Sequence, residues 1–304
     1  MVISPASLAS AASVSSVNAG DAVLAVSMRG SEHAPSVVFA HGFGQTRHAW
    51  EATATTLADR GYRTLSYDAR GHGDSSANAV GLPYSATQFT DDLIVLAGEQ
   101  PEPPVLVAAS MGGLFGLLAE ARWPGLFRAI ALVDITPRWD TTGVERILRF
   151  MTAHPDGFAS LDAAADAIAV YLPHLPRKTP GQLQALLRQR ADGRWRWHWD
   201  PRLVDELAGQ DAQLQQHALL EAAAQVRCPM LLISGGRSDL VTPANIAEFL
   251  SIAQHVHLPH ATHMLAGDDN TTFTATVLHY LDALPAACTI AASNTTEHVT
   301  GARP

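Results

Sequence analysis

The ten residues 105–114 read VLVAASMGGL, and this segment constrains the fold of the chain more than any other. An apolar run enters a turn of small residues, and a second apolar run with helical character follows the turn. A β-strand that ends in such a turn and continues as a helix lifts one side chain out of the backbone at a sharp bend, and here that side chain is the hydroxyl of Ser110. The segment therefore predicts a buried strand, an exposed nucleophile and a helix, in that order.

Apolar strand patterns alternate with amphipathic helical patterns along most of the 304 residues. Strands are expected at 23–26, 37–40, 62–67, 105–108, 130–135, 230–233 and 256–258. Helices are expected at 46–60, 85–96, 111–121 and 272–284, with a further helix that begins at Thr242-Pro243. This alternation predicts an α/β fold with a mostly parallel, doubly wound sheet that is covered by helices on both faces.

Residues 137–224 interrupt the alternation, because helical stretches at 144–152 and 161–171 follow one another with no convincing strand. We interpret this segment as a helical cap inserted between two strands of a core formed by residues 21–136 and 225–285. The small, polar residues 1–20 and the unpatterned residues 286–304 are expected to be flexible.

The composition excludes several classes of function. A net charge of −9 without a basic cluster argues against a nucleic-acid or membrane-surface partner. The longest apolar region, 105–119, is too short to span a membrane, and the N-terminus lacks a secretory signal, so we expect a cytoplasmic protein. Two distant cysteines, Cys228 and Cys288, are read as ordinary thiols. The oligomeric state is left open, a homo-oligomer included.

A serine nucleophile needs a base and an acid that orients the base. After a strand–serine–helix turn these helpers follow in the order Ser, Asp, His, on loops beyond strand ends. Asp239 follows the strand expected at 230–233, and His263 follows the strand expected at 256–258. Each residue alone also fits a turn cap or a structural group. Their order and their positions together favour a triad in which His263 takes the proton of Ser110 and Asp239 orients His263.

The developing oxyanion needs two hydrogen-bond donors. Met111 follows the nucleophile and offers its backbone N–H at a helix start. The loop HGFG, residues 41–44, follows an early strand, and its glycines let the backbone approach a ligand closely. We assign the second donor to the backbone N–H of Phe43.

The chain with these motifs resembles the α/β-hydrolase superfamily. The resemblance covers about residues 23–284 and is carried by HGFG at 41–44, DARGHGDS at 68–75, the Ser110 turn, Gly235…Asp239 and His263-Met264. It implies the α/β-hydrolase fold and the branch that holds small carboxylesterases, lactonases, C–C hydrolases and cofactor-free haloperoxidases, which are perhydrolases. The motifs are specific for the fold and not for the substrate.

Two positions depart from the family pattern. Ala108 stands where the nucleophile turn has glycine, and Thr262 stands where glycine commonly precedes the histidine. The second departure leaves His260 as a rival base. Some superfamily members carry the acid one strand earlier, which makes Asp134 a rival of Asp239.

The remaining candidates are weighed against structural roles. Arg70, His72 and Asp74 are interpreted as a loop held by internal hydrogen bonds. The histidines at 255, 257, 260 and 263 do not converge as zinc ligands do, so we expect no metal, and no cofactor. Phe43, Phe150, Trp195 and Trp197 are expected to contact the substrate, which predicts an apolar acyl or alcohol group.

The predicted function is therefore a serine hydrolase that cleaves a small ester or lactone through an acyl-enzyme, with no cofactor. A lactonase, a C–C bond hydrolase and a cofactor-free haloperoxidase would use the same triad. A non-catalytic receptor for a small molecule on the same scaffold is the alternative from another class. Ser110 argues against epoxide hydrolases and haloalkane dehalogenases, which need aspartate at this position.

Overall fold

The computed structural model describes residues 12–173, 175–204 and 212–285 of the 304. Its central sheet has the strand order β1 (Ser13–Ala19), β2 (Ala22–Arg29), β4 (Arg63–Tyr67), β3 (Ser36–Ala40), β5 (Val105–Ala109), β6 (Ala129–Val133), β9 (Met230–Gly235), β10 (Gln254–Leu258). The strands from β4 to β10 are parallel, and β1 and β2 add an antiparallel edge. The predicted α/β fold with a mostly parallel sheet is confirmed.

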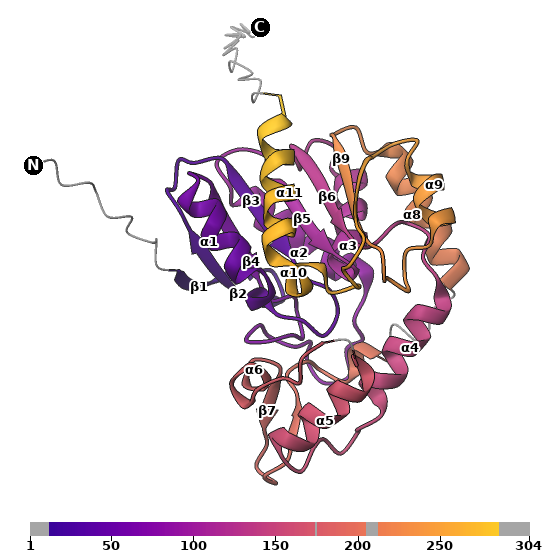
Figure 1. Ribbon diagram of the computed structural model, residues 1–304. Helices are drawn as coiled ribbons and strands as arrows, with labels where there is room; N and C mark the ends of the chain where they lie inside the picture. The colour runs from indigo at the N-terminus through magenta and orange to yellow at the C-terminus, as the bar shows by residue number, and fades with distance from the viewer. Residues whose placement is uncertain (1–11, 174, 205–211, 286–304) are drawn as a thin grey trace, which may run out of the picture.

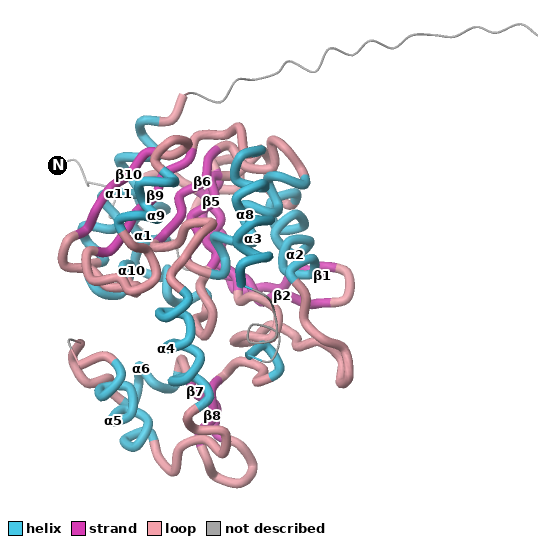
Figure 2. Tube along the Cα trace, turned by 90° about the vertical axis from the view of Figure 1, so that its right-hand side faces the viewer, coloured by secondary structure: helices cyan, strands magenta, loops and turns pink. Residues whose placement is uncertain are grey.

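Successive side chains of each central strand enter different helical layers, because strand side chains alternate between the two faces of a sheet. In β5, Leu106 and Ala108 join the layer of α2 (Ala86–Gly98), α3 (Met111–Arg122) and α8 (Ala212–Gln225). Val105 and Val107 join the opposite layer, with α1 (Glu51–Asp59) and α11 (Asn270–Ala283). Figure 1 shows α1 and α11 in front of the sheet, and Figure 2 shows the sheet between the two layers.

Local sequence signals fix several helix ends. The side chain of Ser85 accepts a hydrogen bond from the backbone of Gln88 and caps α2, and Thr242 caps α9 (Pro243–Phe249) in the same way with Asn245. The short helix η1 (Arg47–Trp50) leads into α1, and Gly61 ends the turn that follows with a φ of +88°. The expected strands and helices are all present, with their ends shifted by a few residues.

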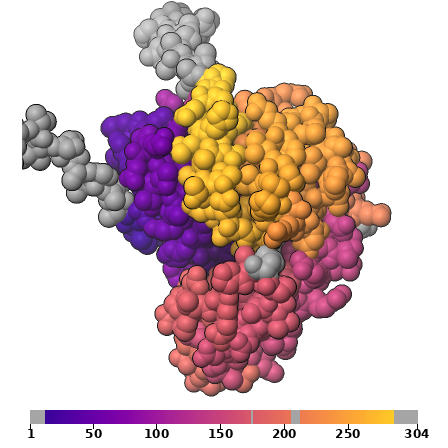
Figure 3. Space-filling view, viewed as in Figure 1, coloured from indigo at the N-terminus to yellow at the C-terminus, as the bar shows by residue number. Residues whose placement is uncertain are grey.

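A separate lobe lies below the main body of the molecule (Figure 3), on the side where Ser110 follows the carboxyl end of β5. It contains α4 (Thr141–Thr152), α5 (Leu161–Tyr171), α6 (Pro180–Gln184) and a hairpin of β7 (Leu187–Gln189) and β8 (Trp195–Trp197). Phe158, Ile168 and Leu183 are buried in a small core that belongs to this lobe. We call this lobe the cap.

Three expectations about the chain's organisation are wrong in detail. Residues 13–19 form the edge strand β1, because seven residue pairs join it to β2; residues 1–11 lie outside the described part. The cap contains the β7–β8 hairpin, although no strand was expected there. The predicted end of the cap at 224 also fails, because α8 packs on α3 and buries Leu219 and Ala223 in the main core.

The predicted flexible tail, 286–304, and Cys288 lie outside the described residues. Among the residues that the structure describes, no helix is both long and apolar enough to cross a membrane.

Candidate active site

Ser110 lies at the junction of β5 and α3, in a backbone conformation that few residues other than glycine adopt. Its φ is +47° and its ψ is −122°, a strained combination that turns the side chain out of the strand direction. A Cβ atom on Gly112 would lie 2.8 Å from the carbonyl oxygens of Ala40 and His41, so only glycine fits this close approach of helix and strand. The sequence VLVAASMGGL thus forms the strand, bend and helix that it predicts.

His263 donates its orienting hydrogen bond to Asp134 rather than to Asp239. The Nδ1 atom of His263 lies 2.8 Å from Oδ2 of Asp134, which is completely buried just after β6 and has a φ of +51°. The other carboxylate oxygen accepts a hydrogen bond of 2.8 Å from the backbone N–H of Gly235, and the Ser238 hydroxyl donates to Oδ2. This carboxylate therefore holds the His263 ring with its Nδ1 proton toward Asp134 and its Nε2 atom directed away.

The assignment of Asp239 as the acid is wrong. Its carboxylate pairs at 2.5 Å with Arg146 of α4, and about a third of its side chain is exposed (34%). The reason lies in the turn after β9, where the backbone N–H of Arg237 donates to the carbonyl of Ala261. That turn places Ser238 against Asp134 and leaves Asp239 at the boundary with the cap. The rival residue Asp134 is the aspartate that contacts His263.

Two backbone N–H groups, next to Ser110 in the chain and in the neighbouring loop, are candidates for binding an oxyanion. The backbone N–H groups of Phe43 and Met111 have no hydrogen-bond partner among the described residues. Met111 begins α3, whose first N–H groups carry the positive end of the helix dipole. A Cβ atom on Gly42 would lie 3.1 Å from the Cβ atom of Ser110, which shows how closely residues 42–44 approach the nucleophile. We call residues 42–44 the oxyanion loop.

A cavity of about 890 Å³ lies between the core and the cap. Ser110 and His263 both line it, and no hydrogen bond joins their side chains in the described part of the chain. Hydrogen bonds between catalytic groups are often long in a site without substrate, and they tighten when the substrate binds. The proposed nucleophile and the proposed base are therefore both exposed to this cavity.

The cavity is lined mostly by apolar side chains, and most of these come from the cap. Of the expected substrate contacts, Phe43, Phe150 and Trp197 line the cavity, whereas Trp195 does not and packs in the cap core instead. The further apolar lining residues include Ile147, Met151, Ile168, Tyr171, Leu172, Leu186 and Met264. Sequence reasoning missed them, although the four-residue spacing of Ile147 and Met151 on one helix predicts that they share a face.

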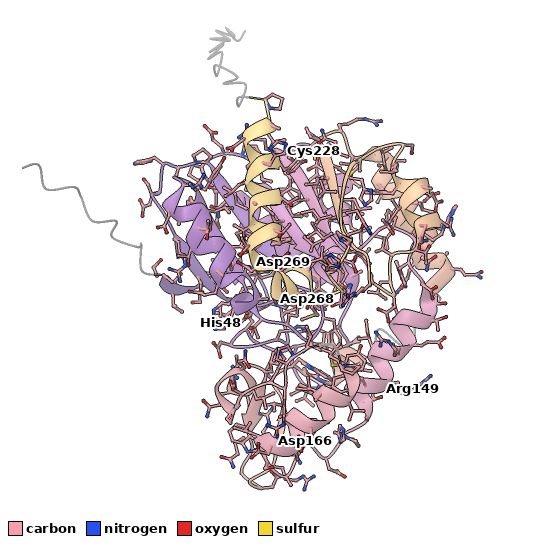
Figure 4. The ribbon with its side chains drawn as sticks, in the orientation of Figure 1. His48, Arg149, Asp166, Cys228, Asp268 and Asp269 are labelled. Atoms are coloured by element: carbon pink, nitrogen blue, oxygen red, sulfur yellow. The ribbon has the colours of Figure 1, made fainter. Side chains whose placement is uncertain are left out.

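The cavity also contains charged side chains from the cap and the loop after β9. Arg146 pairs with Asp239 and lies over the ring of Tyr171, with 5.1 Å between its guanidinium carbon and the ring centre. The other charged lining residues include Arg149, Lys178 and Arg237. Figure 4 shows Arg149 on α4, at the side of the cap.

The loop that carries His263 is fixed by Asp268 of α10 (Leu265–Asp268). The backbone N–H of Thr262 donates to Oδ2 of Asp268 at 2.6 Å, and the Thr262 hydroxyl donates to the same oxygen at 2.5 Å. Threonine in place of glycine thus brings a hydroxyl that ties the loop to α10. His260, the rival base, is exposed and does not line the cavity.

The other polar residues singled out in the sequence have structural contacts. The Arg70 guanidinium donates two hydrogen bonds of 2.7 Å to Asp92, and both side chains are buried. His255 and His257 each form a hydrogen bond with the Ser234 hydroxyl. Burial raises the pKa of Cys228 to about 12, and Figure 4 places this thiol at the end of the core away from the cap, so it does not act as a nucleophile at the cavity.

Comparison with known proteins identifies the family of the chain. A family model described as "Alpha/beta hydrolase family" matches residues 37–276. The chain is 30% identical to esterase Rv0045c of Mycobacterium tuberculosis over 255 residues, which are 81% of this chain and 80% of that protein. It is 28% identical over 233 residues to the 2-(acetamidomethylene)succinate hydrolase of Mesorhizobium japonicum, covering 76% of this chain and 81% of the relative.

Solved structures give the same result for the fold. The crystal structure of E-2-(acetamidomethylene)succinate hydrolase superimposes with a TM-score of 0.77 at 24% identity, and the match covers 90% of this chain and all of the other. The M. tuberculosis esterase Rv0045c superimposes with a TM-score of 0.68 at 26% identity, over 89% of this chain and 92% of that one.

Proposed function

Because this chain belongs to the α/β-hydrolase family and is a hydrolytic enzyme, we propose that it is a serine hydrolase that cleaves carboxylic esters through an acyl-enzyme. In this proposal Ser110 is the nucleophile, His263 is the base and Asp134 is the acid. The hydrogen bond between Asp134 and His263, on the wall of the cavity that Ser110 also lines, is the observation that carries it.

The reaction follows from these positions. The Ser110 oxygen attacks the ester carbonyl while Nε2 of His263 takes the hydroxyl proton, and the ionised Asp134 stabilises the resulting imidazolium. The carbonyl oxygen becomes an oxyanion, which accepts hydrogen bonds from the N–H groups of Phe43 and Met111. His263 then returns the proton to the departing alcohol, which leaves the acyl group on Ser110.

Deacylation repeats the same steps with water. His263 removes a proton from a water molecule as that water attacks the acyl carbonyl, and the proton passes to the Ser110 oxygen as the acid product leaves. The contact between Asp134 and His263 is therefore used twice in one turnover, once in acylation and once in deacylation.

The cavity supports an ester with an apolar acyl or alcohol group. Its lining is dominated by the apolar side chains of the cap, and apolar lining of this kind binds apolar substrate surface. The relative from M. tuberculosis is named an esterase, which also favours this bond type. A small-molecule ester or lactone is the substrate class that we propose.

The proposal is tested with the Ser110→Ala variant. We expect its turnover of p-nitrophenyl acetate, butyrate and octanoate to fall by at least about 10⁴-fold, since loss of the nucleophile in a triad removes most of the catalysis. A fluorophosphonate probe should label the wild type and not the variant. Ser251→Ala, on an exposed serine whose hydroxyl bonds only to the Glu248 carbonyl, is the matched control and should keep full activity.

Other outcomes of this experiment contradict the proposal. Wild-type turnover in Ser110→Ala would place the nucleophile elsewhere. A folded wild type that neither turns over esters nor reacts with the probe would favour a non-catalytic receptor. Lactones, and a peroxide and halide assay, belong in the same panel, because the lactonase and perhydrolase reactions use the same triad.

A further inference from the structure

Three successive peptide groups of the oxyanion loop are each held by a buried histidine. The first is the peptide between Gly42 and Phe43. Its carbonyl oxygen lies 2.8 Å from Nδ1 of His41 and also accepts a hydrogen bond of 3.1 Å from the backbone N–H of Gln45. Since the carbonyl and the N–H of a trans peptide point in opposite directions, fixing this carbonyl fixes the direction of the Phe43 N–H.

The next two peptides are held by His72 and His198. The N–H of Gly44 donates to Nε2 of His72 at 3.2 Å. The carbonyl of Gly44 lies 3.2 Å from Nε2 of His198. The peptide that carries this carbonyl also supplies the Gln45 N–H, which donates to the Gly42 carbonyl. The three peptides are therefore connected by hydrogen bonds into one unit.

The backbone also fixes which nitrogen of His198 carries the proton. The N–H of Gly73 donates to Nδ1 of His198 at 2.8 Å, so Nδ1 is the acceptor and the proton on Nε2 faces the Gly44 carbonyl. Burial lowers the pKa of this imidazole to about 4, which keeps the ring neutral at neutral pH. A neutral ring with this tautomer satisfies both contacts.

His198 differs from the other two histidines because the cap supplies it. It follows β8, it is only 7% exposed, and its backbone N–H donates to the Leu186 carbonyl within the cap. The next residue, Trp199, packs on Phe43, with 5.0 Å between the ring centres. His198 does not line the cavity, so it reaches the substrate only through the oxyanion loop.

We propose that His198 is a positioning residue by which the cap holds the oxyanion loop in the geometry that stabilises the transition state. The inference rests on the proposed serine-hydrolase function. The hydrogen bond from Nε2 to the Gly44 carbonyl is the contact that matters, and the bond from Gly73 to Nδ1 sets the tautomer. Loss of the Gly44 contact releases the third peptide and, through Gln45, loosens the carbonyl that directs the Phe43 N–H.

Two variants separate the nitrogen atoms of His198. The amide of glutamine reaches the position of Nε2 and can donate to Gly44, whereas the amide of asparagine reaches only the position of Nδ1 and can accept from Gly73. We expect His198→Gln to lower kcat by no more than about 3-fold and His198→Asn to lower it roughly 10- to 100-fold, since small displacements of an oxyanion donor cost this much. KM should change little in either variant, because the loop acts on the developing oxyanion.

A transition-state analogue gives an independent readout. The affinity of an alkyl boronic acid should fall in parallel with kcat in His198→Asn and not in His198→Gln. A merely structural role predicts equal losses in the two variants, each of which removes one buried hydrogen bond. An asparagine variant at least as active as the glutamine variant, or losses confined to KM, would overturn the inference.

The wild-type protein supplies a test that needs no variant. Two-bond proton–nitrogen NMR spectra at pH 7 should show one buried histidine as the neutral Nε2–H tautomer, with its signal changed when the boronic acid binds. A His198 ring protonated only on Nδ1, or charged at pH 7, would contradict the proposal. Fluorophosphonate labelling of the wild type distinguishes failure of the serine-hydrolase proposal from failure of the His198 proposal. If the wild type is labelled and active but the glutamine and asparagine variants do not differ as expected, only the role of His198 is refuted.

Discussion

Replacing Asp134 with asparagine should abolish most of the activity while preserving the fold. In Asp134→Asn the Gly235 N–H still requires an acceptor, so the amide oxygen takes that side and the amide NH₂ faces His263. Nδ1 of His263 must then accept, which moves its proton to Nε2, where it cannot take the proton of Ser110. An asparagine that imposes the wrong tautomer in a serine triad lowers kcat by about 10⁴-fold, or about 5 kcal/mol in the activation free energy.

Asp239→Asn is the matched comparison, because it makes the same chemical change in the residue that the sequence favours. Asp239 pairs with Arg146 at a site where both side chains are partly exposed, and such pairs contribute about 0–1 kcal/mol. We expect kcat within about 3-fold of the wild type. The assay is steady-state hydrolysis of p-nitrophenyl butyrate at pH 7.5, with thermal unfolding as the check on folding. A large loss in Asp239→Asn together with near-normal turnover in Asp134→Asn would refute the assignment.

Two further predictions concern stability. Gly112→Ala should destabilise the protein by about 1–3 kcal/mol in urea unfolding, because the added Cβ atom meets two backbone oxygens. The control Gly98→Ala, whose Cβ atom would have nothing within 4 Å, should stabilise α2 by up to about 1 kcal/mol. Equal effects of the two substitutions would contradict the packing argument. Burial lowers the pKa of His198 from 6.5 to about 4, so the unfolded chain takes up a proton first as the pH falls. The stability that the neutral ring contributes is therefore complete well above pH 6.5 and decreases as the pH falls through that value, by roughly 2–3 kcal/mol at pH 4.5. Unfolding of His198→Gln measured at pH 7.5 and 4.5 should lack this part of the pH dependence, and an unchanged difference would contradict the low pKa.

The sequence predicts the nucleophile and base positions because both depend on local patterns at strand ends. Ser110 lies between an apolar strand and an apolar helix, and His263 follows the last strand of a parallel sheet. Parallel strands bring their carboxyl ends to one edge, so the order of the elements is enough to bring these residues to one cavity.

The acid could not be chosen in this way, because two aspartates follow neighbouring strands of the same edge. The choice depends on how the turn after β9 folds, and in particular on the Gly235 N–H and the Ser238 hydroxyl, which both point to Asp134. The positive φ of Asp134, which directs its side chain, also leaves no mark in the sequence pattern.

The boundaries of the cap depend on tertiary packing and not on periodicity. The helix α8 follows the cap helices in the same helical part of the sequence, and its packing against α3 assigns it to the core. The strand β1 consists mainly of serine, valine and asparagine, with little alternation, and its pairing with β2 decides its conformation.

Asp134 lies at the point where the chain passes from the central sheet toward the cap. Residues 135–140 connect Asp134 to the first cap helix, α4, and the backbone N–H of Asp140 donates to the Leu240 carbonyl. A chimera in which the cap is replaced by that of another hydrolase, to change substrate preference, must therefore keep residues 134–140 of this chain as the junction. Cutting closer to β6 would disturb the carboxylate that aligns the base, and the chimera would lose turnover for reasons unrelated to its new pocket.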